Sequence, residues 1–196
     1  MNTKKLIIFI LFLNFNFTYV YSLTPDIFVQ STVNRASEIL SKNISKEQKM
    51  NELKSVAKET VDIRGVGFYS LGAARKNLND DEKKKFLNLF ESYFLKSFSS
   101  RLAEYTNPEI EVKDKQVLNK NYTIVNSLLI ATSDRPEVKI DWRVYTKNPN
   151  NPLIRDLIIE GLSLARTQRE EFTSILNSND GDINALFITL EEFSKN

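Results

Sequence analysis

The stretch "RDLIIEGLSLARTQREEF", residues 155–172, joins the strand-forming part of the sequence to its last helical part. It begins with the apolar residues Leu157, Ile158 and Ile159, which favour a strand, and it ends in a charged segment with helical spacing. Gly161 lies between the two. A glycine inside a strand often marks a bulge or a bend. We therefore expect the sheet to curve where the chain leaves it for the helix.

The sequence before this stretch alternates between apolar and polar residues. In "VKIDWRVYTK", residues 138–147, every second side chain from Val138 to Val144 is apolar and points to one face. Four strands are predicted, over residues 110–118, 122–132, 138–147 and 153–164. The turn-rich links between them are short, so the strands are expected to form an antiparallel meander with one apolar face.

Helical spacing dominates the rest of the chain. From residue 23 to about residue 107, apolar residues recur at three- and four-residue steps, with Ser45 and either Asn79 or Asp80 as predicted N-caps and a bend at residues 64–67. Two closing helices are predicted over residues 165–176 and 183–193. The predicted fold class is α+β, with a helical N-terminal half around a four-stranded antiparallel sheet and with C-terminal helices.

Residues 1–22 have the pattern of a signal peptide. Lys4 and Lys5 give a basic start, residues 6–13 are an apolar run, and Ser22 offers a cleavage position. A membrane anchor is the alternative, but this run is well short of the roughly 20 apolar residues that span a bilayer. We expect residues 1–22 to be removed on secretion and residues 23–196 to form a single domain.

The composition excludes several classes of function. The chain has no cysteine and no histidine, which rules out disulfides and thiol chemistry and removes the commonest zinc ligands and general base. Residues 1–22 hold two of the 27 basic residues and none of the 25 acidic ones, so the remaining chain is formally neutral. A nucleic-acid-binding protein would need a basic surface.

Carboxylates are the remaining candidates for catalysis. Asp156 and Glu160 would lie about 13 Å apart on one strand, at ~3.3 Å per residue, whereas the acid pairs of glycosidases lie roughly 5 to 9.5 Å apart. Asp141 on the neighbouring strand could approach either acid, but Arg143 and Arg155 are available as cross-strand partners. We therefore predict no catalytic residue.

The same stretch resembles a known family signature. The signature is that of the MlaC or toluene-tolerance family of periplasmic phospholipid-binding proteins, and its matching residues here are Asp156, Glu160, Gly161, Ser163, Gln168, Arg169 and Phe172. Upstream, the resemblance continues in "VKIDWRVY" and at Leu71, Gly72, Phe86, Phe90 and Tyr105. Asn151-Pro152 departs from it, because the family usually has Gly-Trp there.

The resemblance implies a carrier and not an enzyme. Its fold would be a highly curved antiparallel sheet wrapped by helices, with the acyl chains of a phospholipid in an apolar cavity and the headgroup outside. Its partners would be an outer-membrane lipoprotein–porin complex and an inner-membrane ABC transporter, and its place the periplasm. We expect a monomer without metal or cofactor, with phospholipid as its cargo.

Apolar residues of the sheet and of the long helix are the candidate walls of that cavity. They are Phe86, Phe90, Tyr93, Phe94, Leu129, Ile140, Trp142, Val144, Leu157, Ile159 and Phe172. Any one of them could equally belong to the core. Two other functions stay open: a secreted binding module for a smaller apolar ligand or a protein partner, and a carboxylate hydrolase with Asp141, Asp156 and Glu160 around one cleft.

Overall fold

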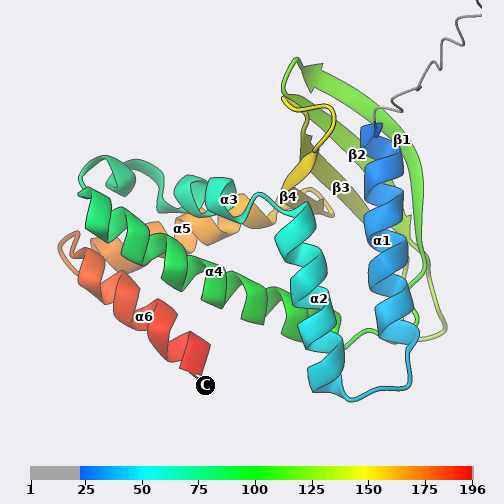
Figure 1. The fold of residues 1–196 in the computed structure, drawn as a ribbon, viewed down its shortest axis with the longest axis horizontal. Coiled ribbons are helices and arrows are strands. Elements are labelled where there is room, and N and C mark those ends of the chain that lie inside the picture. The colour runs from blue at the N-terminus through cyan, green and yellow to red at the C-terminus, as the bar shows by residue number, and fades with distance from the viewer. Residues whose placement is uncertain (1–22, 196) are drawn as a thin grey trace, which may run out of the picture.

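The computed structural model describes residues 23–195, and the predicted signal peptide lies outside this part of the chain (Figure 1). The helices before the sheet are α1 (Pro25–Ser41), α2 (Lys46–Thr60), α3 (Ile63–Leu71), the 3₁₀ helix η1 (Gly72–Lys76) and α4 (Asp80–Leu102). The strands are β1 (Ile110–Asn119), β2 (Tyr122–Leu129), β3 (Val138–Tyr145), β4 (Leu153–Ile159) and β5 (Leu162–Ser163). The closing helices are α5 (Leu164–Asn177) and α6 (Ile183–Lys195). None of the helices within residues 23–195 is long and apolar enough to cross a membrane.

The predicted N-caps are confirmed. The Ser45 side chain accepts a hydrogen bond from the Gln48 backbone N–H, and the Gln48 side chain accepts one from the Ser45 backbone, which closes a capping box at the start of α2. Asn79 and Glu82 form the same arrangement at the start of α4. Each box satisfies two backbone donors that the first turn of a helix leaves without a partner.

The predicted bend at residues 64–67 is wrong, because these residues lie inside α3. Asp62 is the N-cap residue, and its carboxylate accepts a hydrogen bond of 2.9 Å from the Gly65 backbone N–H. Gly67 packs so closely on α4 that an added Cβ would lie 2.7 Å from Cδ1 of Phe90. Gly67 therefore serves close helix packing, and a Cβ at Gly65 would collide with the Asp62 carboxylate that caps α3.

The five strands form one antiparallel sheet in sequence order, which confirms the predicted α+β meander and adds a short fifth strand. The single strand predicted over residues 153–164 is divided in two. Glu160 and Gly161 have φ of 49° and 83° and make a two-residue turn between β4 and β5. The chain thus reverses at Gly161 before α5 begins.

Two layers stand side by side in Figure 1. The sheet curves around α1, while α3 to α6 pack together beside it, and α2 lies between α1 and α4. Separate apolar cores occupy the two layers, and Val61, in the link between α2 and α3, packs against both of them. Val61 is therefore one apolar contact between the sheet layer and the helical layer, and a third core of α1 and α2 residues, packed against Leu102 of α4, is another.

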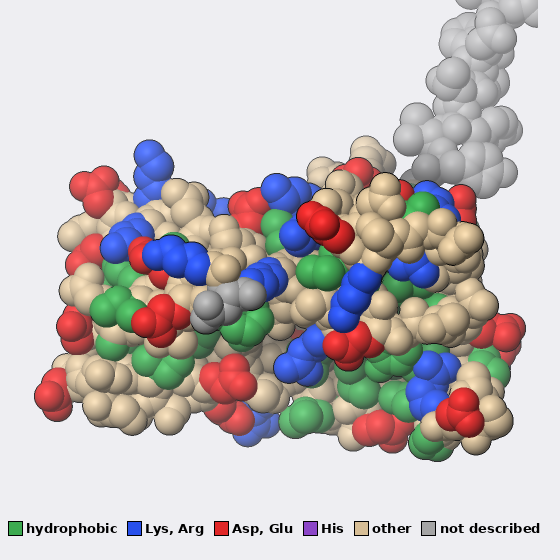
Figure 2. Space-filling model, turned by 90° about the horizontal axis from the view of Figure 1, so that it is seen from below, with side chains coloured by type: hydrophobic (Ala, Val, Ile, Leu, Met, Phe, Trp, Pro, Cys, Tyr) green, Lys and Arg blue, Asp and Glu red, His purple; other side chains and the backbone are tan. Residues whose placement is uncertain are grey.

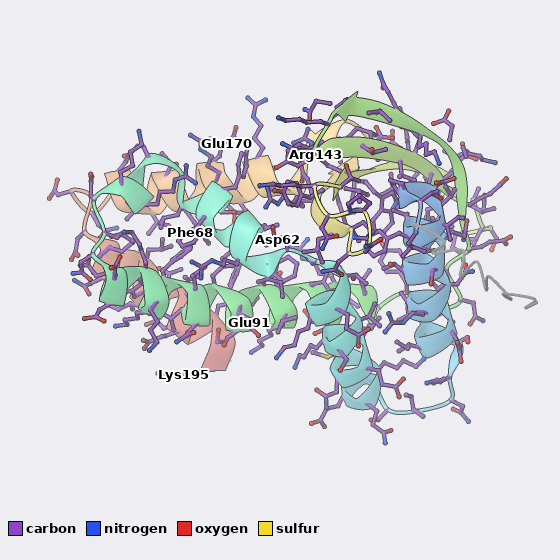
Figure 3. The ribbon with its side chains drawn as sticks, turned by 45° about the horizontal axis from the view of Figure 1, so that its top comes forward. Asp62, Phe68, Glu91, Arg143, Glu170 and Lys195 are labelled. Carbon is purple, nitrogen blue, oxygen red and sulfur yellow. The ribbon has the colours of Figure 1, made fainter. Side chains whose placement is uncertain are left out.

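Polar contacts join the same two layers. Arg155 of β4 donates hydrogen bonds to Asp62 at 2.7 Å and to the Tyr122 hydroxyl at 2.6 Å, and its guanidinium lies 3.7 Å from the ring centre of Tyr145. The Asp62 backbone N–H also donates to the carbonyl of Ile154. These contacts fix the start of α3, drawn with Asp62 labelled in Figure 3, against the start of β4.

Candidate functional site

One face of the sheet, which we call the inner face, packs against α1. Phe28, Val29 and Val33 of α1 form a core with Val125, Val144 and Ile154 of the sheet. The strands that α1 contacts most are β1 and β2. Trp142 and Leu157, on β3 and β4, lie at the margin of this core and remain partly exposed. Helix α1 therefore covers one part of the inner face, and the part around Trp142 and Leu157 is only half covered.

A hydrogen-bond chain holds Trp142 in place on this face. The indole Nε1–H donates to Oγ of Ser127 at 2.8 Å, and the Ser127 hydroxyl donates to the carbonyl of Ile140 at 3.0 Å. Ser127 is buried, so its hydroxyl finds its partners within the protein. The polar edge of the indole is thereby satisfied, and its apolar part is left to pack or to bind a ligand.

Cross-strand pairing extends the inner face toward the last strand. Ser127 lies opposite Ile140, Ile140 opposite Ile159, and Ile159 opposite Leu162. Directly opposed residues share one face of a sheet, so these four side chains form a row across it. Leu129, also on β2, is buried farther along the same face.

The aromatic residues of α4 mostly fill the helical core. Phe86 and Phe90 are stacked with their ring centres 5.7 Å apart, and the ring of Phe172 from α5 meets both edge-on. All three side chains are at most 2% exposed. Phe94 is partly exposed, and Tyr93, also partly exposed, donates a hydrogen bond of 2.9 Å to Oε1 of Gln168.

The eleven predicted wall residues therefore divide by exposure. Six are enclosed by other side chains: Phe86, Phe90, Leu129, Ile140, Val144 and Phe172. Five keep surface that a ligand could cover: Tyr93, Phe94, Trp142, Leu157 and Ile159. Phe98, which is not among the predicted walls, is also partly exposed and stacks on Phe94 at 5.7 Å. Its four-residue spacing from Phe94 is the sequence signal that points to it.

The three candidate carboxylates have structural partners. Asp156 accepts hydrogen bonds from the Ser163 hydroxyl at 2.6 Å and from the Ala165 backbone N–H at 3.0 Å, and it lies 3.5 Å from the Arg143 guanidinium. It thus anchors the first turn of α5, where a negative charge is favourable. Asp141 accepts from the Asn126 amide, and Glu160 accepts from the Lys139 backbone N–H.

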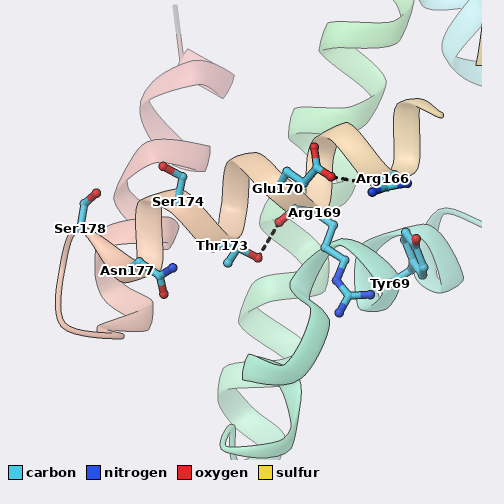
Figure 4. A pocket seen from close by; sticks show the side chains of 8 residues that line it. All are labelled: Tyr69, Arg166, Arg169, Glu170, Thr173, Ser174, Asn177 and Ser178. Carbon is cyan, nitrogen blue, oxygen red and sulfur yellow. Dashed lines mark hydrogen bonds and ion pairs between the residues drawn. The ribbon is translucent and has the colours of Figure 1, made fainter. Parts of the chain in front are cut away.

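Two open hollows lie on the helical layer. The larger, about 680 Å³, lies between Tyr69 of α3 and a polar side of α5 that includes Arg166 and Arg169 (Figure 4). The other, about 510 Å³, lies between α3 and α4 near Phe68 and Glu91, both labelled in Figure 3. Neither is lined by a predicted wall residue. The enclosed apolar cavity of the fold prediction therefore stays a prediction.

Charges of both signs are mixed on the face drawn in Figure 2. Exposed ion pairs occur on the surface of residues 23–195, such as Arg35 with Glu59 and Lys42 with Glu52. Exposed pairs of this kind contribute little to stability, at most about 1 kcal/mol each. The mixture agrees with the formal neutrality of residues 23–196.

Comparison with known proteins identifies the family. The family model described as MlaC protein matches residues 30–192. The chain belongs to the MlaC family. A search of curated proteins found no match. Among solved structures, the phospholipid-binding protein from Ralstonia solanacearum in complex with a phospholipid has the same fold, with a TM-score of 0.73. It is 18% identical, and the match covers 87% of this chain and 96% of that one.

The MlaC signature can now be placed in the fold. Its Asp156 and Ser163 are hydrogen bonded to each other, its Gln168 accepts from Tyr93, and its Phe172 lies in the helical core. Gly72, with φ of 60°, ends α3 where a Cβ would lie 3.0 Å from Nε of Arg169. The signature residues thus join β4, β5, α3, α4 and α5 and make none of the pairings that catalysis would need. MlaC proteins are binding proteins, and the prediction of a non-enzymatic protein is confirmed.

Proposed function

We propose that this MlaC protein is a periplasmic phospholipid carrier, which moves lipid between the outer membrane and an inner-membrane ABC transporter. The observation that carries the proposal is the half-covered part of the inner face. There Trp142, Leu157 and Ile159 of the sheet keep exposed apolar surface, while Val125, Val144 and Ile154 of the same face are buried against α1. The Ralstonia solanacearum protein, whose fold is the same, was solved with a phospholipid bound.

Acyl chains are the part of the ligand that this surface would hold. Each methylene removed from water contributes about 0.8 kcal/mol, so a lipid crosses an aqueous compartment only if its chains are shielded. We assign the sheet side of the shield to Trp142, Leu157 and Ile159, and the helix side to Phe94 and Phe98. The enclosed residues Phe86, Phe90, Val144 and Phe172 would support these walls from behind.

The cellular setting belongs to the same proposal. Residues 1–22 would direct the chain to the periplasm and be removed, and residues 23–196 would work as one domain and as a monomer. The partners would be an outer-membrane lipoprotein–porin complex and the inner-membrane transporter. The formal net charge of residues 23–196 is zero, and this neutrality fits partners that are lipids and proteins and not nucleic acids.

Native mass spectrometry of protein purified from its own periplasm tests the proposal. We expect a mass above that of residues 23–196 by one or more phospholipids, and lipid extraction should identify the headgroup. A smaller apolar ligand in the same spectrum would point to the alternative binding module. Protein that carries no lipid and takes up none from phospholipid micelles would refute the carrier.

A further inference from the structure

The turn between β4 and β5 exposes two leucines beside the inner face. Leu162 is 60% exposed and Leu164 is 43% exposed. Single exposed leucines are common on protein surfaces and need no explanation. The position of Leu162 is more informative, because the residue opposite it in the sheet is Ile159, one of the half-covered residues of the inner face.

Two independent contacts fix the face on which Leu162 lies. Its pairing with Ile159 places it on the inner face. Its neighbour Ser163 reaches the other way, because the Ser163 hydroxyl donates to the buried carboxylate of Asp156 at 2.6 Å. Successive residues of a strand point to opposite faces, so the two observations agree.

The row across the inner face becomes steadily more exposed toward Leu162. Ser127 is 1% exposed and Ile140 is 8% exposed, Ile159 is partly exposed, and Leu162 is the most exposed of the four. A path of apolar side chains therefore runs from the interior of the sheet layer to its edge at β5.

The hairpin that carries Leu162 is held in place. The Glu160 backbone N–H donates to the carbonyl of Lys139 at 3.0 Å, and the Glu160 carboxylate accepts from the Lys139 backbone N–H. On its other side, Asp156 holds the start of α5 through Ala165. Leu162 on β5 and Leu164 at the start of α5 therefore project from fixed elements and not from a loose loop.

We propose that Leu162, with Leu164 beside it, forms the lip over which an acyl chain enters and leaves the inner face. This inference rests on the proposed carrier function and adds the place of entry. An acyl chain that leaves a bilayer must cross from lipid to protein, and each methylene exposed to water on the way raises the barrier. An apolar side chain at the rim shortens that exposed passage.

The test separates the rate of lipid exchange from the amount of lipid bound. Protein loaded with phospholipid is mixed with detergent micelles that contain a fluorescent phospholipid, at a detergent concentration chosen so that wild-type protein exchanges within an hour. The micelles contain no protein, so loss of docking to a partner cannot affect the rate. The variants are Leu162→Ser and Leu164→Ser, with Leu162→Met as the conservative change.

Leu118→Ser is the matched control. Leu118 is 46% exposed and lies on β1, the strand at the opposite edge of the sheet. We expect Leu162→Ser to hold as much lipid as wild type, to unfold at the same temperature, and to exchange roughly threefold to tenfold more slowly, because the apolar contact of one leucine is lost along the path. Leu162→Met should restore the rate, and Leu118→Ser should not change it.

Two results would overturn the entry site and leave the carrier function standing. One is exchange by Leu162→Ser at the wild-type rate. The other is a loss of bound lipid in Leu162→Ser, which would make Leu162 a wall of the site and not its lip. A wild-type protein that binds no phospholipid would instead refute the proposed function itself.

Discussion

The indole of Trp142 and the hydroxyl of Ser127 are joined by a hydrogen bond of 2.8 Å across neighbouring strands. Trp142 is the only tryptophan of the chain, so its fluorescence reports on this one place. The bond fixes the orientation of the largest apolar side chain on the half-covered part of the inner face. This contact, the exposure of Leu157 and the hydrogen bonds of Asp156 and Tyr93 lead to four predictions.

Ser127→Ala should leave the Trp142 N–H without its partner in a region where water has little access. A buried donor without a partner costs about 1 to 3 kcal/mol, and urea unfolding should show a loss of that size. The tryptophan emission should also shift, because the indole is free to turn. Ser55→Ala, at an exposed helix position, is the control and should change neither quantity. An unchanged emission spectrum in Ser127→Ala would mean that the hydroxyl does not orient the ring.

Leu157→Asp and Val144→Asp should have different effects. Val144 is fully buried in the core beneath α1, so a charge there has no access to water and should unfold the domain, at a cost of several kcal/mol. Leu157 is partly exposed, so a charge there can stay hydrated once lipid has left. We expect Leu157→Asp to remain folded in thermal unfolding and to lose bound phospholipid in mass spectrometry. If Leu157→Asp kept its lipid, Leu157 would not line the site.

Asp156→Asn should affect stability and not chemistry. The carboxylate has three polar partners, and charge-assisted hydrogen bonds are worth about 1.5 to 3 kcal/mol each, so we expect a loss of about 2 kcal/mol in urea unfolding. Glu170→Gln on α5 removes only an exposed pair with Arg166 and should cost less than about 0.5 kcal/mol. A hydrolytic activity that Asp156→Asn abolishes in a stable fold would contradict this role.

Tyr93 should make stability fall at high pH. Burial raises the pKa of the Tyr93 phenol above its ordinary value of 10.0. The folded state then holds this proton more tightly than the unfolded state. The contribution of the Tyr93 phenol to the free energy of unfolding is therefore complete below pH 10 and is lost as the pH rises through the raised pKa of the folded state.

Tyr93→Phe has no phenol to ionise and is the comparison for this prediction. At neutral pH it should be less stable by about 1 kcal/mol, because the bond to Gln168 is gone. As the pH rises above about 10, the difference between the two proteins should shrink. Parallel stability curves over that range would show that Tyr93 is not desolvated in the folded protein.

Elements whose signals are local were predictable from the sequence. Ser45 and Asn79 were recognised because a capping box needs only residues three apart, and the strand around Trp142 because alternation appears within eight residues. The helix around Gly65 and Gly67 was missed, since glycine disfavours helices and only the contact of Gly67 with Phe90 explains it. The turn at Glu160 was missed because a glutamate with positive φ has no sequence signal.

The candidate site could be predicted only in part. Phe90 and Phe94 lie four residues apart on one helix and look alike in sequence, yet one is enclosed and the other is partly exposed. Likewise, Val144 and Trp142 share one face of one strand, but α1 and its neighbours close over Val144 alone. Which apolar residue is core and which is surface depends on where another helix lies, and a pattern of spacings does not contain that information.

The edge strand β1 has a consequence for self-association. An unpaired strand edge is a template on which a second chain can add a strand and start aggregation. In β1, Lys113 and Lys115 interrupt the edge, the second of them tied to Asp26 of α1 at 2.6 Å, and a bulge between Val112 and Asp114 breaks its regular hydrogen-bond pattern. Charge and irregularity at this edge oppose the addition of a strand from a second chain. Apolar surface can therefore remain exposed on the inner face while the β1 edge of the same sheet resists aggregation.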